Sequence, residues 1–173
     1  MISRATLVFI AAAVIAATSP LTRAEAEILK FHAALDGRYG MEPSGSSAAG
    51  KAAISVDTNT RRVSVKLAVR GITIDDLWDK LVAAPIGPIH FHKYAGSDSV
   101  LVLPLPFGPN YRATPAGLAV AMKDYDYVAG AAILKSTLSF DDFVAAMKDG
   151  QIVLNIHTDK FNPGEISGLV VAD

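Results

Sequence analysis

Histidines are the side chains in this sequence with the clearest potential for chemistry. The chain has four of them, at His32, His90, His92 and His157. His90 and His92 are separated by a single residue, Phe91. Side chains two positions apart on a strand point to the same face. Two imidazoles on one face suit a metal ion, because neutral imidazole is a common ligand. Two polar residues on a solvated strand face would give the same pattern.

His157 strengthens the metal interpretation. It follows the apolar run 152–156 and precedes a turn at 162–164, and strand ends beside turns often carry functional residues. We therefore predict a site of His90, His92 and His157, built from two strands and leaving a coordination position open. His32 lies on the polar face of the predicted first strand, where we expect a solvated or hydrogen-bonded structural residue.

The ligand types favour copper. Imidazole suits copper, zinc, iron and nickel, and the affinity for divalent ions is highest at copper. Soft ligands for a cuprous carrier are scarce, since the chain has no cysteine and no methionine adjacent to the H-x-H motif. We expect Cu(II), with zinc or iron as alternatives. Glu165 and Asp159 are predicted to hydrogen-bond to a ligating histidine or to supply a fourth ligand, although Glu165 could equally pair with a turn amide or a nearby cation.

Composition narrows the remaining function classes. The 173 residues are 51% hydrophobic and 19% charged, with a net charge of −1, which is typical of one folded domain. This charge balance argues against a nucleic-acid binder that works through a basic face. The lack of cysteine excludes disulfides, thiolate metal sites and a cysteine nucleophile. The sequence also has no G-x-S-x-G motif and no glycine-rich phosphate loop.

The N-terminal residues 1–26 have the features of a secretory signal peptide. Arg4 precedes an apolar run at 7–17, Pro20 interrupts it, and Ala24-Glu25-Ala26 has the small-x-small pattern of a cleavage site. Eleven apolar residues are too few for a membrane span, which needs about 20. We expect a mature chain of residues 27–173 that is periplasmic or secreted, forms a single domain and has no membrane span.

The mature chain has mostly strand patterns. Short helices are predicted to begin at Thr73 and Ser139, which are typical N-cap residues. Residues 104–117 hold four prolines and are predicted to form a loop, with Phe107, Tyr111 and Arg112 available to line a small-molecule site. About eight short strands with two helical insertions predict an all-β sandwich. The strands are expected among nine candidate runs: 28–35, 51–56, 62–69, 88–93, 99–103, 118–122, 127–134, 151–157 and 164–171.

Two motifs in this order resemble the CHRD (chordin) domain family. They are Gly87-Pro88-Ile89-His90-Phe91-His92, and Val153 to Thr158 followed by Asn162-Pro163-Gly164-Glu165-Ile166-Ser167-Gly168. The similarity extends over about 28–171 and implies an immunoglobulin-like, Greek-key β-sandwich related to copper/zinc superoxide dismutase. It would match His90 and His92 to the dismutase H-x-H copper ligands and His157 to a further ligand. Ser167 replaces the usual arginine, and the zinc-loop histidines have no counterpart, so only a one-metal site is implied.

Two main functions remain open from the sequence, beside the small-molecule site considered for residues 104–117. One is an exported copper protein that dismutates superoxide, as a metal oxidoreductase, or that holds copper. The other is a non-catalytic binding or assembly module for a protein partner, in which the histidines are structural.

Overall fold

The computed structural model describes residues 27–95 and 98–173, and this part of the chain forms one antiparallel sheet of nine strands. The order across the sheet is β5-β4-β8-β9-β1-β2-β3-β7-β6. The strands are β1 (Ile28–Asp36), β2 (Ala49–Asp57), β3 (Arg62–Arg70), β4 (Ile89–Ala95), β5 (Asp98–Leu105), β6 (Tyr111–Thr114), β7 (Gly117–Asp126), β8 (Ile152–Ile156) and β9 (Ile166–Ala172).

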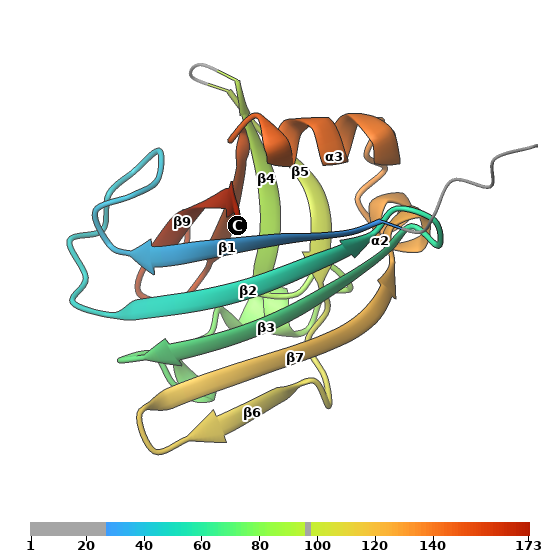
Figure 1. Cartoon of the computed structure of the whole chain (residues 1–173). Coiled ribbons are helices and arrows are strands. Elements are labelled where there is room, and N and C mark those ends of the chain that lie inside the picture. The colour runs from blue at the N-terminus through green and yellow to red at the C-terminus, as the bar shows by residue number, and fades with distance from the viewer. Residues whose placement is uncertain (1–26, 96–97) are drawn as a thin grey trace, which may run out of the picture.

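The sheet curls so that its two halves face each other. In Figure 1, β4 and β5 run behind β1, β2 and β3 and cross them at a steep angle. One hydrophobic cluster contains Phe31 and Val65 from one half together with Phe91 and Leu103 from the other. Because both halves bury side chains in the same core, the predicted all-β, sandwich-like fold is confirmed.

Alternation along the strands sets which face is buried. In β1, Phe31, Ala33 and Leu35 point into the core while the residues between them face outward, and β2 and β3 alternate in the same way. β2 and β3 form an antiparallel hairpin. The carboxylate of Asp57 accepts hydrogen bonds of 2.9 Å from the backbone N–H groups of Asn59 and Thr60, as in an Asx turn.

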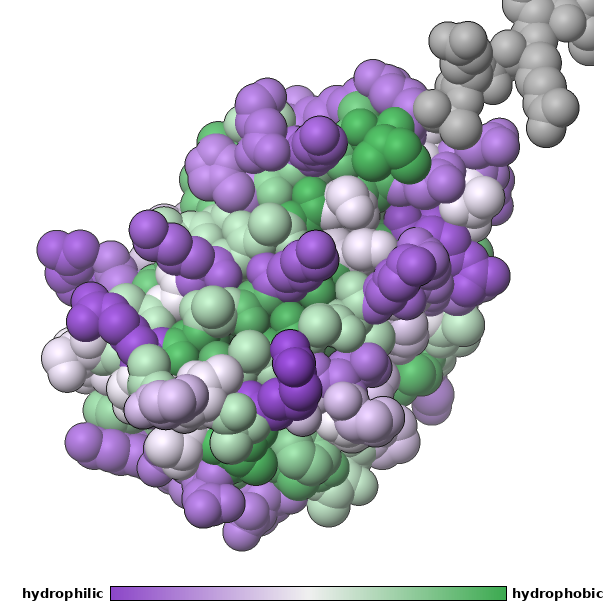
Figure 2. Space-filling model, turned by 60° about the horizontal axis from the view of Figure 1, so that its bottom comes forward, coloured by the Kyte–Doolittle hydropathy of each residue, from purple (hydrophilic) through white to green (hydrophobic). Residues whose placement is uncertain are grey.

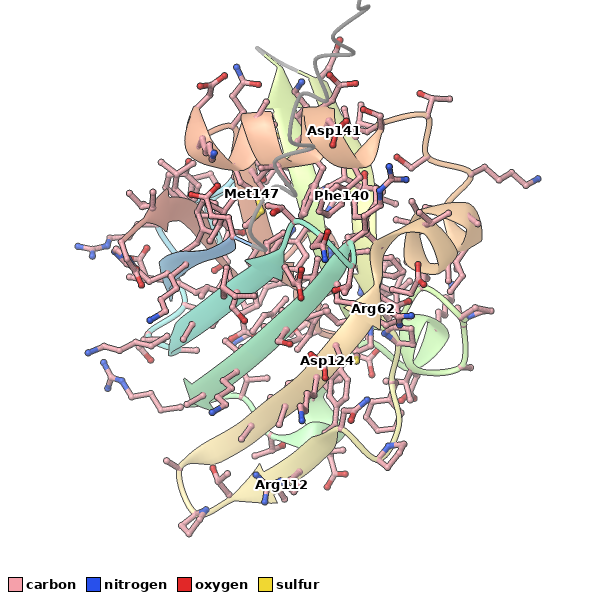
Figure 3. All side chains as sticks on the ribbon, turned by 45° about the vertical axis from the view of Figure 1, so that its right-hand side comes forward. Arg62, Arg112, Asp124, Phe140, Asp141 and Met147 are labelled. Carbon is pink, nitrogen blue, oxygen red and sulfur yellow. The ribbon has the colours of Figure 1, made fainter. Side chains whose placement is uncertain are left out.

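The helix predicted at Ser139 is α3 (Phe140–Lys148), and it covers one side of the sheet. The hydroxyl of Ser139 accepts a hydrogen bond from the backbone N–H of Asp142, as an N-cap does. Figure 3 shows Phe140 and Met147 directed toward the sheet and Asp141 directed away from it. The helix therefore contributes its apolar face to the core.

Two local predictions were wrong. Residues 127–134 form α2 (Tyr127–Ile133) rather than a strand, because the Asp126 carboxylate accepts from the N–H of Ala129 and caps a helix at that point. Residues 104–117 are not a continuous loop, since β5 extends to Leu105 and β6 pairs with β7. Tyr111 is buried, and its hydroxyl donates to the carbonyl oxygen of Leu105. It therefore does not offer its hydroxyl to a ligand.

The helix predicted to begin at Thr73 is divided into two short pieces. A 3₁₀ turn, η1 (Ile74–Asp76), precedes α1 (Asp79–Val82). Between them Leu77 is fully buried and forms an isolated β-bridge with Thr158, which breaks the helix. This contact ties the segment to the chain that follows His157.

No helix in the described part of the chain is long and apolar enough to cross a membrane. The predicted signal peptide, residues 1–26, lies outside the described residues, so its removal and the export of the chain remain predictions.

Candidate metal site

The structure brings His90, His92 and His157 together. One nitrogen from each ring can be chosen so that all three atoms lie within 4.8 Å of one another. The ring centroid of His90 lies 4.8 Å from that of His92 and 4.4 Å from that of His157. The predicted grouping of these three residues is therefore present in the fold.

Strand pairing explains why the rings converge. His90 and His92 lie on β4, which pairs with β8 so that His90 is opposite Asn155. His157 directly follows β8, and its backbone N–H donates to the carbonyl oxygen of Pro88 at 2.9 Å. The side chains of Ile89 and Phe91 point into the core, so those of His90 and His92 point to the opposite face of the sheet. Loops cover that face, and His90 and His157 are only 2% and 7% exposed.

Each ring is oriented through its Nδ1 atom. Nδ1–H of His90 donates to the carbonyl oxygen of Gly87 at 3.2 Å, and Nδ1–H of His157 donates to that of Asn162 at 2.7 Å. Nδ1 of His92 forms a 2.7 Å hydrogen bond with the hydroxyl of Ser99. A carbonyl oxygen can only accept, so His90 and His157 must carry their proton on Nδ1. Their Nε2 atoms then keep a free lone pair.

Two of the three Nε2 atoms are shielded from solvent. Those of His92 and His157 are buried and have no hydrogen-bond partner within the described structure. A buried polar atom without a partner costs about 1–3 kcal/mol, so native proteins rarely leave two side by side without a reason. A metal ion bound between the rings would satisfy both atoms.

The electrostatics keep the rings neutral. Burial, followed by the proximity of His157 and His92, lowers the pKa of His90 from 6.5 to about 2. Burial and the proximity of His157 lower the pKa of His92 to about 4. Burial also lowers the pKa of His157, against the opposing effect of the Asn162 carbonyl. All three are therefore neutral at pH 7, which is the form that binds metal.

The residues fit a three-coordinate metal centre. Imidazole nitrogens bind zinc or copper at about 2.0–2.1 Å, which places three such atoms about 3.5 Å from one another. The observed upper limit of 4.8 Å is longer than this, so the rings would have to move closer together to bind one ion. The donor set, the free Nε2 lone pairs and the burial all suit a transition-metal ion.

Glu165 and Asp159, predicted to assist the histidines, form their hydrogen bonds elsewhere. The two carboxylate oxygens of Glu165 accept from the hydroxyls of Ser46 at 2.6 Å and Thr158 at 2.8 Å. Asp159 accepts from the backbone N–H of Asp79 at 3.3 Å. Glu165 thus joins the 37–48 segment to the loop after β8, and any role of either carboxylate toward a metal remains a prediction.

Sequence reasoning missed the residues that shape the site. Asn155 is buried, donates to the carbonyl oxygen of Pro163 and accepts from the hydroxyl of Ser167. Gly164 has φ +134°, and a Cβ there would collide with the Asn155 carboxamide, so only glycine fits. The only available signal was the position of Asn155 two residues before His157, on the same strand face.

A hollow of about 220 Å³ lies next to His92. Its wall includes Met41, Tyr94, Ser99 and Ser167. Ser167, at the position where the resemblance calls for arginine, is small enough to leave this space open. The hollow gives small molecules a place beside one ligand of the site.

His32 takes no part in the site. It is exposed on β1, and its Nδ1 lies 2.7 Å from a carboxylate oxygen of Asp173. It is exposed and hydrogen-bonded, as expected for a residue on the polar face of the first strand.

A comparison with protein-family models agrees with the family resemblance of the two sequence motifs. No curated protein and no solved structure gave a match to this chain. The family model of the CHRD domain matches residues 31–170, which include all three clustered histidines and every strand from β2 to β8. The chain therefore belongs to the CHRD domain family.

Proposed function

We propose that this CHRD protein is exported and binds one copper ion through the Nε2 atoms of His90, His92 and His157. The observation that carries the proposal is the pair of buried Nε2 atoms, on His92 and His157, that have no partner in the described structure. Structural histidines, as in a pure assembly module, would be expected to satisfy both ring nitrogens. Here each ring forms a hydrogen bond through Nδ1, and the Nε2 atoms of His92 and His157 are buried without a partner in the described structure.

Copper is favoured over zinc and iron by the chemistry of the ligands. Three neutral imidazoles and no thiolate form a nitrogen donor set, for which copper has the highest affinity among divalent first-row ions. The hydrogen bonds from Nδ1 to backbone carbonyls fix the rings and increase the basicity of Nε2. Zinc would bind the same atoms, so the metal must be identified by measurement.

The burial of His90 and His157 supports a role in holding copper. A superoxide dismutase-like redox activity is the second candidate, and the observation that favours it is the hollow beside His92. Three protein ligands leave a coordination position free, and redox turnover would require a small anion to reach it. The loaded protein should therefore be assayed for superoxide consumption.

The test is metal analysis of the full chain expressed with its own N-terminus, compared with variants. The wild-type protein should contain close to one copper per chain, and His92→Ala should contain none. His32→Ala is the matched control, because it removes an exposed imidazole on β1 and should leave copper unchanged. Recovery of the protein in the periplasm or medium, without residues 1–26, would test export.

Two results would overturn the proposal. In the first, wild-type protein incubated with Cu(II) or Zn(II) stays metal-free after desalting. In the second, His92→Ala and His32→Ala retain equal amounts of metal. Thermal unfolding of each variant without metal shows whether a loss of metal reflects a loss of fold.

A further inference from the structure

The outward face of β2, β3, β7 and β6 carries long cationic side chains over a floor of alanines. We call this surface the cationic face; its charged members are Lys51, Lys66, Arg70 and Arg112, and its small members are Ala53, Ala68, Ala119 and Ala121. All four cations are exposed. Figure 2, which brings the lower side of Figure 1 forward, shows hydrophobic residues exposed between separate hydrophilic side chains.

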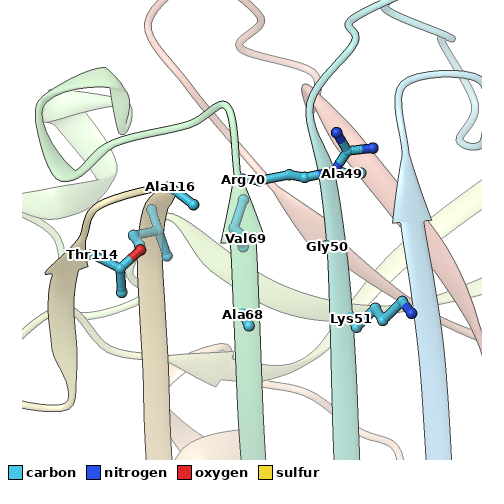
Figure 4. A pocket seen from close by; sticks show the side chains of 9 residues that line it. Ala49, Gly50, Lys51, Ala68, Val69, Arg70, Thr114 and Ala116 are labelled. Carbon is cyan, nitrogen blue, oxygen red and sulfur yellow. The ribbon is translucent and has the colours of Figure 1, made fainter.

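Strand register produces the pattern. Lys51 is opposite Ala68, Lys66 lies between Ala53 and Ala121, and Arg112 is opposite Ala119. Like charges directly opposite each other would be destabilising, and this arrangement places every cation opposite an alanine. Lys51 is then diagonal to both Lys66 and Arg70, at backbone separations of about 7–8 Å. Figure 4 shows Lys51 and Arg70 on neighbouring strands, beside the small side chains of Ala49 and Ala68.

The positive charge of this face is not neutralised within the described part of the chain. Ion pairs there join other residues, such as Arg62 with Asp126 and Lys123 with Asp124. No acidic side chain lines the two hollows that share Lys51 and Ala68, whereas Asp173 lines a third hollow beside Ala53 and Lys66. The whole protein has a net charge of −1, so these cations form a local excess that attracts an anionic partner.

The two hollows give the face its shape. They have volumes of about 350 and 420 Å³, and they share Lys51 and Ala68 in their walls. They exist because alanines lie between long lysine and arginine side chains, whose apolar stems form the sides. A chain lying across the strands would occupy both hollows and meet all four cations.

The lining disfavours several kinds of anionic partner. β2, β3 and β7 are paired on both sides, so an added peptide strand could pair only with the four-residue edge strand β6. Neither hollow has an aromatic side chain on which nucleobases could stack. The exposed floor is alanine, without the large apolar side chains that insert into a lipid surface.

We propose that the cationic face binds a linear acidic polysaccharide, whose carboxylates pair with the four cations while its sugar rings lie on the alanine floor. Such a chain carries anionic groups at regular intervals and presents C–H surfaces that fit a floor of methyl groups. This site is on a different part of the sheet from the three histidines, so the proposal does not depend on metal binding.

The test measures binding of a uronic-acid hexasaccharide to the purified protein by calorimetry at low ionic strength. The variant Lys66→Glu/Arg70→Glu should lose at least tenfold in affinity. The matched control, Lys80→Glu/Lys148→Glu, makes the same change in net charge on α1 and α3 and should bind like the wild type. Wild-type affinity should fall as salt is added, because exposed charges are screened. Lys66→Gln/Arg70→Gln, which adds no repulsion, should weaken binding by less.

Several outcomes would overturn the proposal. Wild-type protein that does not bind the hexasaccharide excludes it, and equal losses in the two Glu variants would show a nonspecific effect of net charge. Tighter binding of hexaglutamate, or of vesicles rich in anionic phospholipid, would assign the face to another class of partner.

Two controls support the assignment. Unchanged thermal unfolding of the Glu variants would show that the loss of affinity is a local effect of the substitutions. Binding that persists in His92→Ala would separate this site from the metal site.

Discussion

His157 and Asn162 are joined by a 2.7 Å hydrogen bond from the imidazole Nδ1–H to the backbone carbonyl oxygen. The turn that contains Asn162 therefore decides which nitrogen of His157 holds the proton. Asn162 is fixed in turn, because its side-chain N–H groups donate to the carbonyl oxygens of Thr158 and Asp159. The loop after β8 thus orients His157 within the three-histidine cluster through a backbone carbonyl group.

This relationship predicts the tautomers of the metal-free protein. His90 and His157 should both be protonated at Nδ1 and unprotonated at Nε2 at pH 7, because each Nδ1 faces a carbonyl oxygen. Long-range ¹⁵N–¹H correlation spectra of the imidazoles distinguish the two tautomers directly. Protonation of Nε2 in either ring would contradict the site geometry, and the exposed His32 provides an internal reference.

Acid should destabilise the metal-free protein before its carboxylates are protonated. The unfolded chain binds protons on these histidines below pH 6.5, whereas folding lowers the pKa of His90 to about 2 and of His92 to about 4. The unfolded state then binds more protons than the folded state. The free energy of unfolding therefore decreases as the pH is lowered, by up to about 1.4 kcal/mol per pH unit for each histidine. Above pH 7 these groups should contribute no slope.

Urea unfolding with a chelator at pH 7.5, 6.0 and 5.0 measures this slope. The window lies above the carboxylate range, since Asp36, Asp57 and Asp76 have pKa values lowered from 3.8. His90→Ala/His92→Ala should flatten the slope, and His32→Ala should leave it unchanged. A wild-type stability that is constant from pH 7.5 to 5.0 would contradict the burial of neutral imidazoles.

Gly164→Ala should be strongly destabilising. The new methyl group would meet the Asn155 carboxamide, and φ of +134° is unfavourable for any residue with a Cβ. We expect a loss of about 2–4 kcal/mol, from overpacking and backbone strain together. Gly108→Ala is the control, because nothing lies within 4 Å of its added methyl group. Equal unfolding free energies for the two variants would show that Asn155 can move aside.

Glu165→Gln should affect stability more than metal content. Glu165 accepts hydrogen bonds from Ser46 and Thr158, and an amide presents only one acceptor oxygen in place of two. We expect a loss of about 1–2 kcal/mol, while copper remains near one per chain. Thermal unfolding and metal analysis on the same sample separate these effects. Complete loss of copper from a folded variant would instead make Glu165 a ligand or a partner of one.

The sequence predicted the parts of the fold that depend on local pattern. The alternating residues in β1 to β3 and the cap at Ser139 both depend on near neighbours in the chain. Tertiary contacts overrode the pattern in α2, where Gly130 lies against Leu103 and Tyr125 and allows a helix to approach β5 closely. The four residues of β6 lie in a proline-rich segment that does not show a strand pattern. Within the described residues they pair with β7 alone, and this contact cannot be read from the local sequence.

The same distinction between local pattern and long-range strand pairing applies to the candidate site. The spacing of His90 and His92 predicts that they share a face, and this requires only a strand. That His157 would join them depends on β8 pairing with β4, which no local pattern encodes. The hydrogen-bond partners were harder to predict, because Gly87 and Asn162 act through backbone carbonyls that every residue type has.

The pairing of β4 with β8 also bears on how the protein would acquire its metal. His92 and His157 are separated by roughly 65 residues of chain, which must fold back before the two rings meet. An unfolded chain would have at most the two histidines of β4 to offer, so full coordination would wait for assembly of the sheet. Once bound, the ion would act as a reversible cross-link that slows unfolding. Exchange of metal should then be limited by the rate at which β8 separates from β4, and resistance to chelators would report on folding kinetics.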